Sequence, residues 1–67
     1  MERFFAAKDD KEPYVYVWHW DGTHAWALSG ECYDYRIKSV FSYNELLKDT
    51  RFMEINDPRI PPIDIGF

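Results

Sequence analysis

The strongest constraint on the fold is the run Tyr14–Trp20, which is followed directly by Asp21-Gly22. Every residue of this run is aromatic or β-branched, and such residues favour strands. An Asp-Gly pair between two apolar runs is the strongest short hairpin signal, because a type I′ turn needs a positive φ at both central positions. The sequence therefore predicts an antiparallel hairpin from Tyr14 to Ser29 as the organising element of the fold.

A two-residue Asp-Gly turn fixes the predicted pairing of this hairpin by counting outward from the turn. His19 then faces His24, and Trp18 faces Ala25. Side chains alternate between the two faces of a strand. One face is therefore predicted to carry a stripe of large aromatic side chains: Tyr14, Tyr16, Trp18 and Trp20. The other face is predicted to carry Val15, Val17, His19, His24, Trp26 and Leu28.

Three further segments are predicted to be strands. Arg3–Lys8 is a short apolar and aromatic run, and Arg51–Ile55 is a candidate for the last strand. In Glu31–Lys38 the apolar residues alternate with polar ones, which is typical of a half-buried strand with one wet face.

A short helix is predicted over Tyr43–Asp49. Ser42 is a good N-cap, and Glu45 stands three residues later, which makes a capping box. Phe41 before the cap and Leu46 within the helix fit a hydrophobic staple. A longer helix would carry one apolar stripe over Leu46, Leu47, Thr50 and Met53. The short helix is preferred because Asp49 and Thr50 are weak helix formers.

The predicted fold class is therefore α+β: a small antiparallel sheet of three to five strands around a central Asp-Gly hairpin, one short helix and a proline-rich tail. Residues 1–55 form a single domain, and residues 56–67 form an extended tail because proline and the residue before it avoid helix. Ile63 and Ile65 alternate around Asp64, as in a strand. The tail is expected either to dock on its own sheet, which is preferred because exposed Ile and Phe favour aggregation, or to add to a partner's sheet.

Composition excludes several classes of protein. With 46% hydrophobic and 19% aromatic residues in 67 positions, the chain is expected to fold. A net charge of −4 argues against direct binding to nucleic acid, which relies on clustered Lys and Arg. The sequence has no secretory signal, no run long enough to span a membrane, and a lone Cys32 that cannot form an internal disulfide. We expect a cytoplasmic protein, in the host cytoplasm if the chain is viral.

The patterns that typify catalysis are missing from the sequence. Ser29-Gly30 is not a nucleophile elbow, and three glycines do not make a phosphate loop. We therefore expect no enzymatic activity and no cofactor. His19 and His24 on facing strands suggest a zinc or copper site, completed by Glu31, Cys32 or Asp21. Structural zinc normally takes four ligands, often in close Cys pairs, so no metal is assigned.

One short helix cannot cover both faces of a hairpin sheet, so one aromatic face is expected to stay open as a partner surface. The expected partner-binding residues are Tyr14, Tyr16, Trp18, Trp20, Trp26, Ile63, Ile65 and Phe67. The leading hypothesis is a non-enzymatic protein-interaction module. It would be an acidic inhibitor or adaptor, phage-type or regulatory, that binds a larger protein such as a nucleic-acid enzyme. A second copy of the chain is another candidate partner. The alternative function is a small-ligand or metal-binding domain that uses the paired histidines and the aromatic hairpin face.

Overall fold

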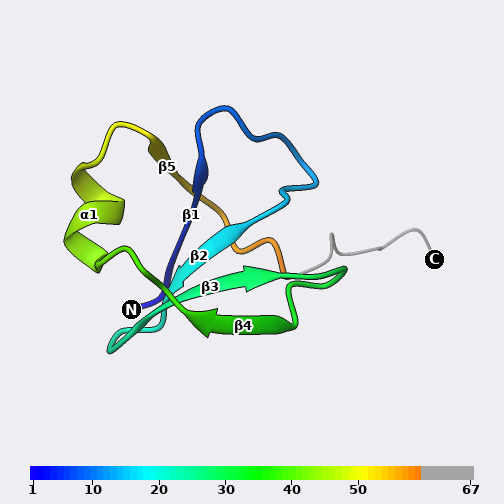
Figure 1. The fold of residues 1–67 in the computed structure, drawn as a ribbon, viewed down its shortest axis with the longest axis horizontal. Coiled ribbons are helices and arrows are strands. Elements are labelled where there is room, and N and C mark those ends of the chain that lie inside the picture. The colour runs from blue at the N-terminus through cyan, green and yellow to red at the C-terminus, as the bar shows by residue number, and fades with distance from the viewer. Residues whose placement is uncertain (60–67) are drawn as a thin grey trace.

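The computed structural model describes residues 1–59 of the chain. Within this range the chain forms an antiparallel five-stranded sheet and one short helix (Figure 1). In chain order the elements are β1 (Arg3–Ala7), β2 (Val17–Trp20), β3 (Ala25–Ser29), β4 (Tyr35–Lys38), α1 (Tyr43–Lys48) and β5 (Phe52–Ile55). The strand order across the sheet is β4-β3-β2-β1-β5. This architecture agrees with the predicted α+β class.

The register between β2 and β3 differs from the predicted one. Val17 pairs with Leu28, and His19 pairs with Trp26 rather than with His24. The pairing is therefore shifted by two residues from the one that a two-residue turn would give. Because side chains alternate with a period of two, this even shift leaves each residue of the two strands on its predicted face.

The reason for the shift lies in the loop between the two strands, which runs from Asp21 to His24. The Asp21 N–H donates to the carbonyl of His24 (3.0 Å). The Asp21 carboxylate accepts hydrogen bonds from the backbone N–H groups of Thr23 (2.7 Å) and His24 (2.6 Å) and from Trp26 Nε1 (2.9 Å). The Asp21 side chain thus closes a longer loop, and the prediction of a two-residue Asp-Gly turn is wrong.

The register shift also shortens the predicted strand Tyr14–Trp20. β3 ends at Ser29, which this register places opposite Tyr16, so residues before Tyr16 have no partner in β3. Val15 N–H instead donates to the Asp10 carboxylate (3.0 Å), within the connection from β1. The aromatic run is therefore a strand only in its second half.

The centre of the sheet is buried on both faces. On one face Phe4, Val17 and Leu28 form a cluster, and on the other face Phe5 packs with Leu46 of α1 and Phe52 of β5. Consecutive phenylalanines on β1 serve the two clusters because neighbouring side chains of a strand point to opposite faces. We call the second group, Phe5, Leu46 and Phe52, the helix-side cluster.

The start of α1 matches the prediction. Glu45 N–H donates to Ser42 Oγ (3.2 Å), and Ser42 N–H donates to Glu45 Oε1 (3.0 Å), so the capping box is present. The helix ends at Lys48, which confirms the short helix. Leu46 is its buried residue, and Phe41 packs against the same helix-side cluster.

The prediction of a half-buried strand over Glu31–Lys38 is wrong. β4 covers only Tyr35–Lys38, and all its residues are exposed, with Tyr35 at 62% and Ile37 at 53%. α1 packs over β1 and β5 at the opposite end of the sheet, and no described element covers β4. The predicted tail lies outside the described residues from position 60 onward.

Candidate functional site

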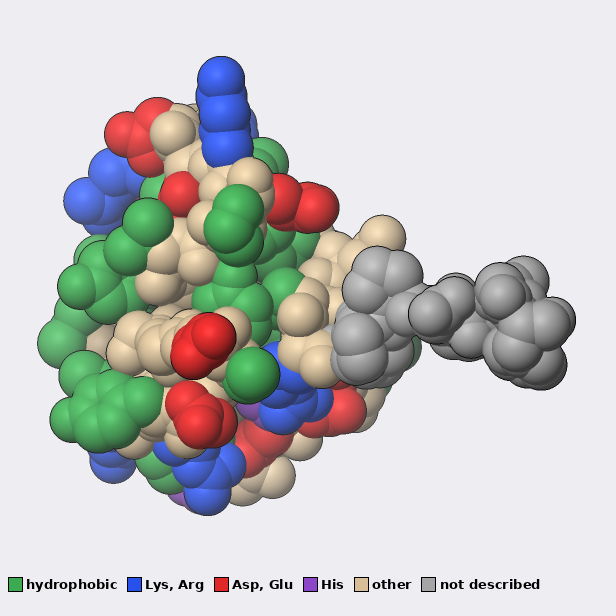
Figure 2. All heavy atoms as spheres, turned by 90° about the vertical axis from the view of Figure 1, so that its right-hand side faces the viewer, with side chains coloured by type: hydrophobic (Ala, Val, Ile, Leu, Met, Phe, Trp, Pro, Cys, Tyr) green, Lys and Arg blue, Asp and Glu red, His purple; other side chains and the backbone are tan. Residues whose placement is uncertain are grey.

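A groove of about 780 Å³ lies between β5 and two of the connections between strands. The β1–β2 connection, the β3–β4 connection and the segment Met53–Pro58 line it. Its acidic lining residues are Glu12, Glu31, Glu54 and Asp57, and its apolar and aromatic ones are Pro13, Tyr14, Tyr33, Met53, Ile55 and Pro58. We call it the acidic groove. The connections that carry Glu12 and Glu31 lie on the right-hand side of Figure 1. That side faces the viewer in Figure 2, which shows apolar side chains at its middle and acidic side chains above and below them.

A hydrogen bond between the two connections holds one wall of the groove. The Tyr33 hydroxyl donates to the backbone carbonyl of Tyr14 (2.7 Å). Both rings also pack against the buried cluster that contains Val17. The Asp10 carboxylate accepts from the backbone N–H groups of Lys11 (2.8 Å) and Val15 (3.0 Å), which shapes the β1–β2 connection just before the groove. Hydrogen bonds and packing against the buried cluster thus hold this wall of the groove in place.

The surroundings of Tyr33 are apolar and negatively charged. Burial raises the pKa of its hydroxyl above the ordinary value, and the nearby charges of Asp10 and Glu12 raise it further. Both effects disfavour ionisation of the Tyr33 hydroxyl, which would add a negative charge to an already negative region. The same negative field favours a positive charge brought in by a ligand.

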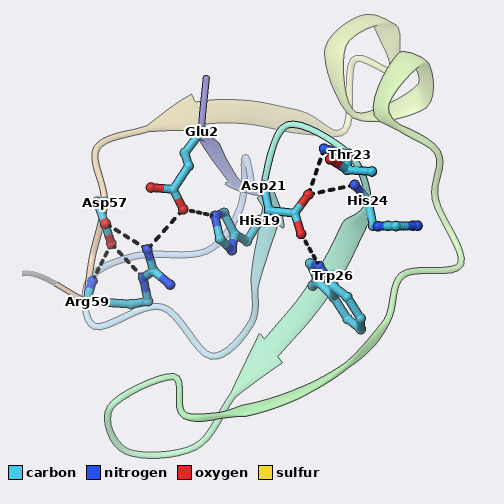
Figure 3. Close-up of polar contacts among 8 residues, drawn as sticks. All are labelled: Glu2, His19, Asp21, Thr23, His24, Trp26, Asp57 and Arg59. Atoms are coloured by element: carbon cyan, nitrogen blue, oxygen red, sulfur yellow. Dashed lines mark hydrogen bonds and ion pairs between the residues drawn. The ribbon is translucent and has the colours of Figure 1, made fainter.

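A chain of polar contacts among His19, Glu2 and Arg59 positions Asp57 at the opposite wall (Figure 3). His19 is only 4% exposed, and its Nε2 lies 2.7 Å from Oε1 of Glu2. The same Glu2 oxygen lies 3.5 Å from Nη2 of Arg59, which lies 3.1 Å from Oδ2 of Asp57. His19 and Arg59 also pack on Phe4: the His19 ring is stacked at 4.3 Å, and the Arg59 guanidinium lies 4.8 Å from the ring centre. The N-terminal segment, β2 and the segment after β5 are therefore held together.

Asp57 stays ionised within this arrangement. Partial burial raises its pKa, but the hydrogen bonds from the side chain and backbone of Arg59 outweigh that effect and leave the pKa below its ordinary value. Its charge is largely balanced by Arg59, since the two side chains are joined by a close ion pair.

The remaining carboxylates of the groove are less balanced. Glu54 is an exception, because alternation along β5 directs its side chain to the opposite face of the sheet, where it lies 3.7 Å from the Arg3 guanidinium. Glu12 and Glu31 form no hydrogen bond or ion pair with another side chain in residues 1–59, and no Lys or Arg lines the groove. The groove is therefore negatively charged, and its acidic residues lie among apolar and aromatic ones.

The predicted aromatic stripe is divided between the two faces of the sheet. Trp18 packs edge-to-face on Phe52 (5.0 Å), and Trp20 is stacked on Tyr43 (4.3 Å), so both belong to the margin of the helix-side cluster. Tyr14 packs on the opposite face and lines the acidic groove. The prediction of one shared face for the four aromatic residues is therefore wrong.

The other predicted partner-binding residues lie elsewhere. Tyr16 is 56% exposed, and its ring lies 6.5 Å from that of Trp18. Trp26 is half-buried on the groove side of the sheet, with the Arg36 guanidinium 4.4 Å from its ring centre. Ile63, Ile65 and Phe67 fall outside the described residues. Tyr14 is thus the one described residue of the predicted set that lines the groove.

The geometry does not support the suggested metal site. The observed register places Trp26 opposite His19, and His24 lies in the loop beyond the strands. His19 is already hydrogen-bonded to Glu2, and Cys32 is exposed. Within residues 1–59 no three His, Cys, Asp or Glu side chains are grouped so that they could hold a metal ion.

Sequence reasoning missed the groove because its carboxylates are far apart along the chain. The pairing of β5 with β1 brings the end of the domain beside the two connections. Only this pairing lets one groove be lined by Glu12, Glu31, Glu54 and Asp57. No local sequence pattern predicts the pairing of β5 with β1. The available signal was indirect: an acidic residue two positions before a tyrosine in each connection, as in Glu12-Pro13-Tyr14 and Glu31-Cys32-Tyr33.

Two broader observations complete the description. In the part of the chain that the structure describes, no helix is both long and apolar enough to cross a membrane. Comparison of the chain with protein-family models, with curated proteins and with solved structures finds no match, so no function is carried over from a relative.

Proposed function

We propose that the protein is a non-enzymatic protein-binding module and that the acidic groove holds a basic segment of its partner. The observation that supports this most directly is the composition of the groove: the acidic residues Glu12, Glu31 and Asp57 lie among apolar and aromatic lining residues, with no basic residue in the lining. Concave sites with apolar walls and a few polar groups are the usual places where ligands bind.

The mixed lining suits lysine and arginine side chains in particular. Their aliphatic stems pack on apolar surface while the charged heads reach for polar groups. Met53 and Ile55 supply such a surface, and Glu12 and Glu31 supply carboxylates that are not already paired within the described residues. The rings of Tyr14 and Tyr33 add sites for cation–π contact.

The net charge of −4 supports the same partner chemistry. Complementary charge speeds encounter and selects partners more than it raises affinity. Proteins that act on nucleic acids present basic surfaces for phosphate binding, so an acidic inhibitor or adaptor of such a protein is one form that this function takes.

The test is binding of a labelled peptide rich in Lys and Arg, followed by fluorescence anisotropy at physiological salt. Neutralising Glu12 and Glu31 together (Glu12→Gln with Glu31→Gln) should weaken binding by about 2- to 30-fold, because two exposed ion pairs are lost and each is worth about 0.2–1 kcal/mol. The matched control is Asp9→Asn with Asp34→Asn, which removes the same charge from the same two connections at positions outside the lining.

The control variant should bind within about twofold of the unmodified chain, because Asp9 and Asp34 are not among the lining residues and exposed charges that form no close ion pair contribute little to binding. Equal weakening by both double variants would show a general charge effect and contradict a role for the groove. Absence of binding at millimolar peptide would contradict the proposed function itself.

A further inference from the structure

We infer, resting on the proposed function, that the basic partner segment binds in an extended conformation and adds as a new strand to the outer edge of β5. β5 is the last strand of the sheet and pairs on one side only, with β1. An outer strand presents unpaired backbone N–H and C=O groups, which are a template for another chain.

The phase of the ladder shows which backbone groups point outward. Lys8 N–H donates to the carbonyl of Arg51 (2.9 Å), which makes these two residues a hydrogen-bonded pair. Antiparallel pairs alternate in this respect, so residues 51, 53 and 55 direct their backbone groups toward β1, and residues 52 and 54 direct theirs away. Phe52 N–H is already taken by the carbonyl of Asp49 (3.2 Å). Both backbone groups of Glu54 and the carbonyl of Phe52 therefore face a strand that would dock on β5.

The groove lies where side chains of such a strand would project. Met53 and Ile55 point to the same face of β5 by alternation, and both line the groove. A strand beside β5 would therefore direct every second side chain to the face of the sheet that carries the groove. A segment with basic residues at alternate positions would bring them toward Glu12, Glu31 and Asp57.

Charge selects a foreign segment over the segments of this chain. Residues 60–67 contain Asp64 and no Lys or Arg, so their charge does not complement the groove. The one stretch of the sequence with basic residues at alternate positions is Arg36-Ile37-Lys38, which lies in β4. Docking of β4 from a second copy would join chains head to tail. It is disfavoured by the net charge of each copy, and by Arg36, whose guanidinium lies over Trp26.

Alternate N-methylation of a peptide tests strand addition separately from charge. A peptide of alternating Lys and Val is prepared unmethylated, with N-methyl groups on every Lys, or with N-methyl groups on every Val. The three peptides carry the same charge, but each methylated form loses the backbone donors of one edge. If the lysine side chains lie over the groove, the backbone N–H groups of only one residue type, Lys or Val, point toward β5.

We expect one methylated peptide to bind about tenfold or more weakly and the other to bind like the parent, because two or more backbone hydrogen bonds are lost in only one case. On the protein, Glu54→Pro removes the outward N–H, and Glu54→Gln removes the same charge while keeping that N–H. Proline is tolerated on an outer strand where its nitrogen faces solvent, and circular dichroism checks the fold of both variants. Glu54→Pro should bind the parent peptide severalfold more weakly than Glu54→Gln.

The outcomes separate the two proposals. Equal binding of all three peptides, together with equal binding by the two Glu54 variants, would overturn strand addition and leave the proposed function standing. Failure of the parent peptide to bind would overturn both. Sedimentation of the protein alone would reveal the competing occupant: self-association that is abolished by Lys38→Glu and blocks the peptide would overturn the assignment to a foreign segment.

Discussion

Truncation of Leu46 to alanine tests how the single helix is attached to the sheet. Leu46 is 1% exposed and is the buried residue of α1, packed with Phe5 and Phe52. Removing its side chain leaves a cavity between the helix and the sheet. Leu46 is the buried residue of this six-residue helix, so no other buried side chain of α1 can fill the space. Leu→Ala changes in fully buried positions typically cost 2–5 kcal/mol, so we expect a loss of about 3 kcal/mol or more.

This loss is large for a chain of this length. Stability of about 0.05–0.15 kcal/mol per residue gives roughly 3–10 kcal/mol for the whole domain. Leu46→Ala should therefore remove a third or more of the free energy of unfolding. Leu47→Ala is the matched control, because Leu47 is the next residue of the same helix and is 41% exposed. We expect that variant to change the stability by less than about 1 kcal/mol.

Urea unfolding followed by tryptophan fluorescence measures both variants. Trp18 and Trp20 pack beside the helix-side cluster, so their emission reports directly on the region that is changed. A loss below about 1 kcal/mol for Leu46→Ala, or an equal loss for Leu47→Ala, would refute the packing of α1 described above, because a fully buried Leu costs at least about 2 kcal/mol to truncate.

Three further predictions concern polar contacts. Ser42→Ala removes the acceptor for Glu45 N–H at the helix start and should cost about 0.5–2 kcal/mol, measured by urea unfolding, whereas Ser42→Asp should retain most of the stability. Tyr33→Phe removes the hydrogen bond to the carbonyl of Tyr14 and should cost about 0.5–1.5 kcal/mol; an unchanged midpoint would show that the bond does not hold the wall of the groove. Asp57 has a lowered pKa in the folded chain, so the stability it contributes is present above about pH 4 and is lost as the pH falls toward the folded value. Thermal unfolding from pH 7 to pH 2 should therefore decline less steeply for Asp57→Asn than for the unmodified chain, and parallel curves would contradict this.

Much of the fold follows from local patterns in the sequence. The capping box of Ser42 and Glu45 predicts the helix start correctly because it depends on neighbouring residues alone. The apolar and aromatic run Arg3–Lys8 and the candidate strand Arg51–Ile55 likewise correspond to strands in the structure, β1 and β5. These signals are short in range, so the rest of the chain does not override them.

The errors arise where tertiary contacts decide between local alternatives. The Asp-Gly pair favours a two-residue turn, but the Asp21 carboxylate binds the N–H groups of Thr23 and His24 and stabilises a longer loop. That change removes the facing pair of histidines on which the metal hypothesis depended. The groove could not be predicted at all, because it requires β5 to pair with β1 across most of the sequence.

The most direct test of the central claim is NMR mapping of a Lys- and Arg-rich peptide on the isotope-labelled protein. We predict that the largest changes in backbone amide shifts fall on residues 12–14, 31–33 and 53–57, which line or border the acidic groove. The exposed positions Tyr16, Tyr35 and Ile37 should change little. Changes confined to those exposed positions, or spread evenly over every acidic residue, would contradict the claim that the groove binds the partner.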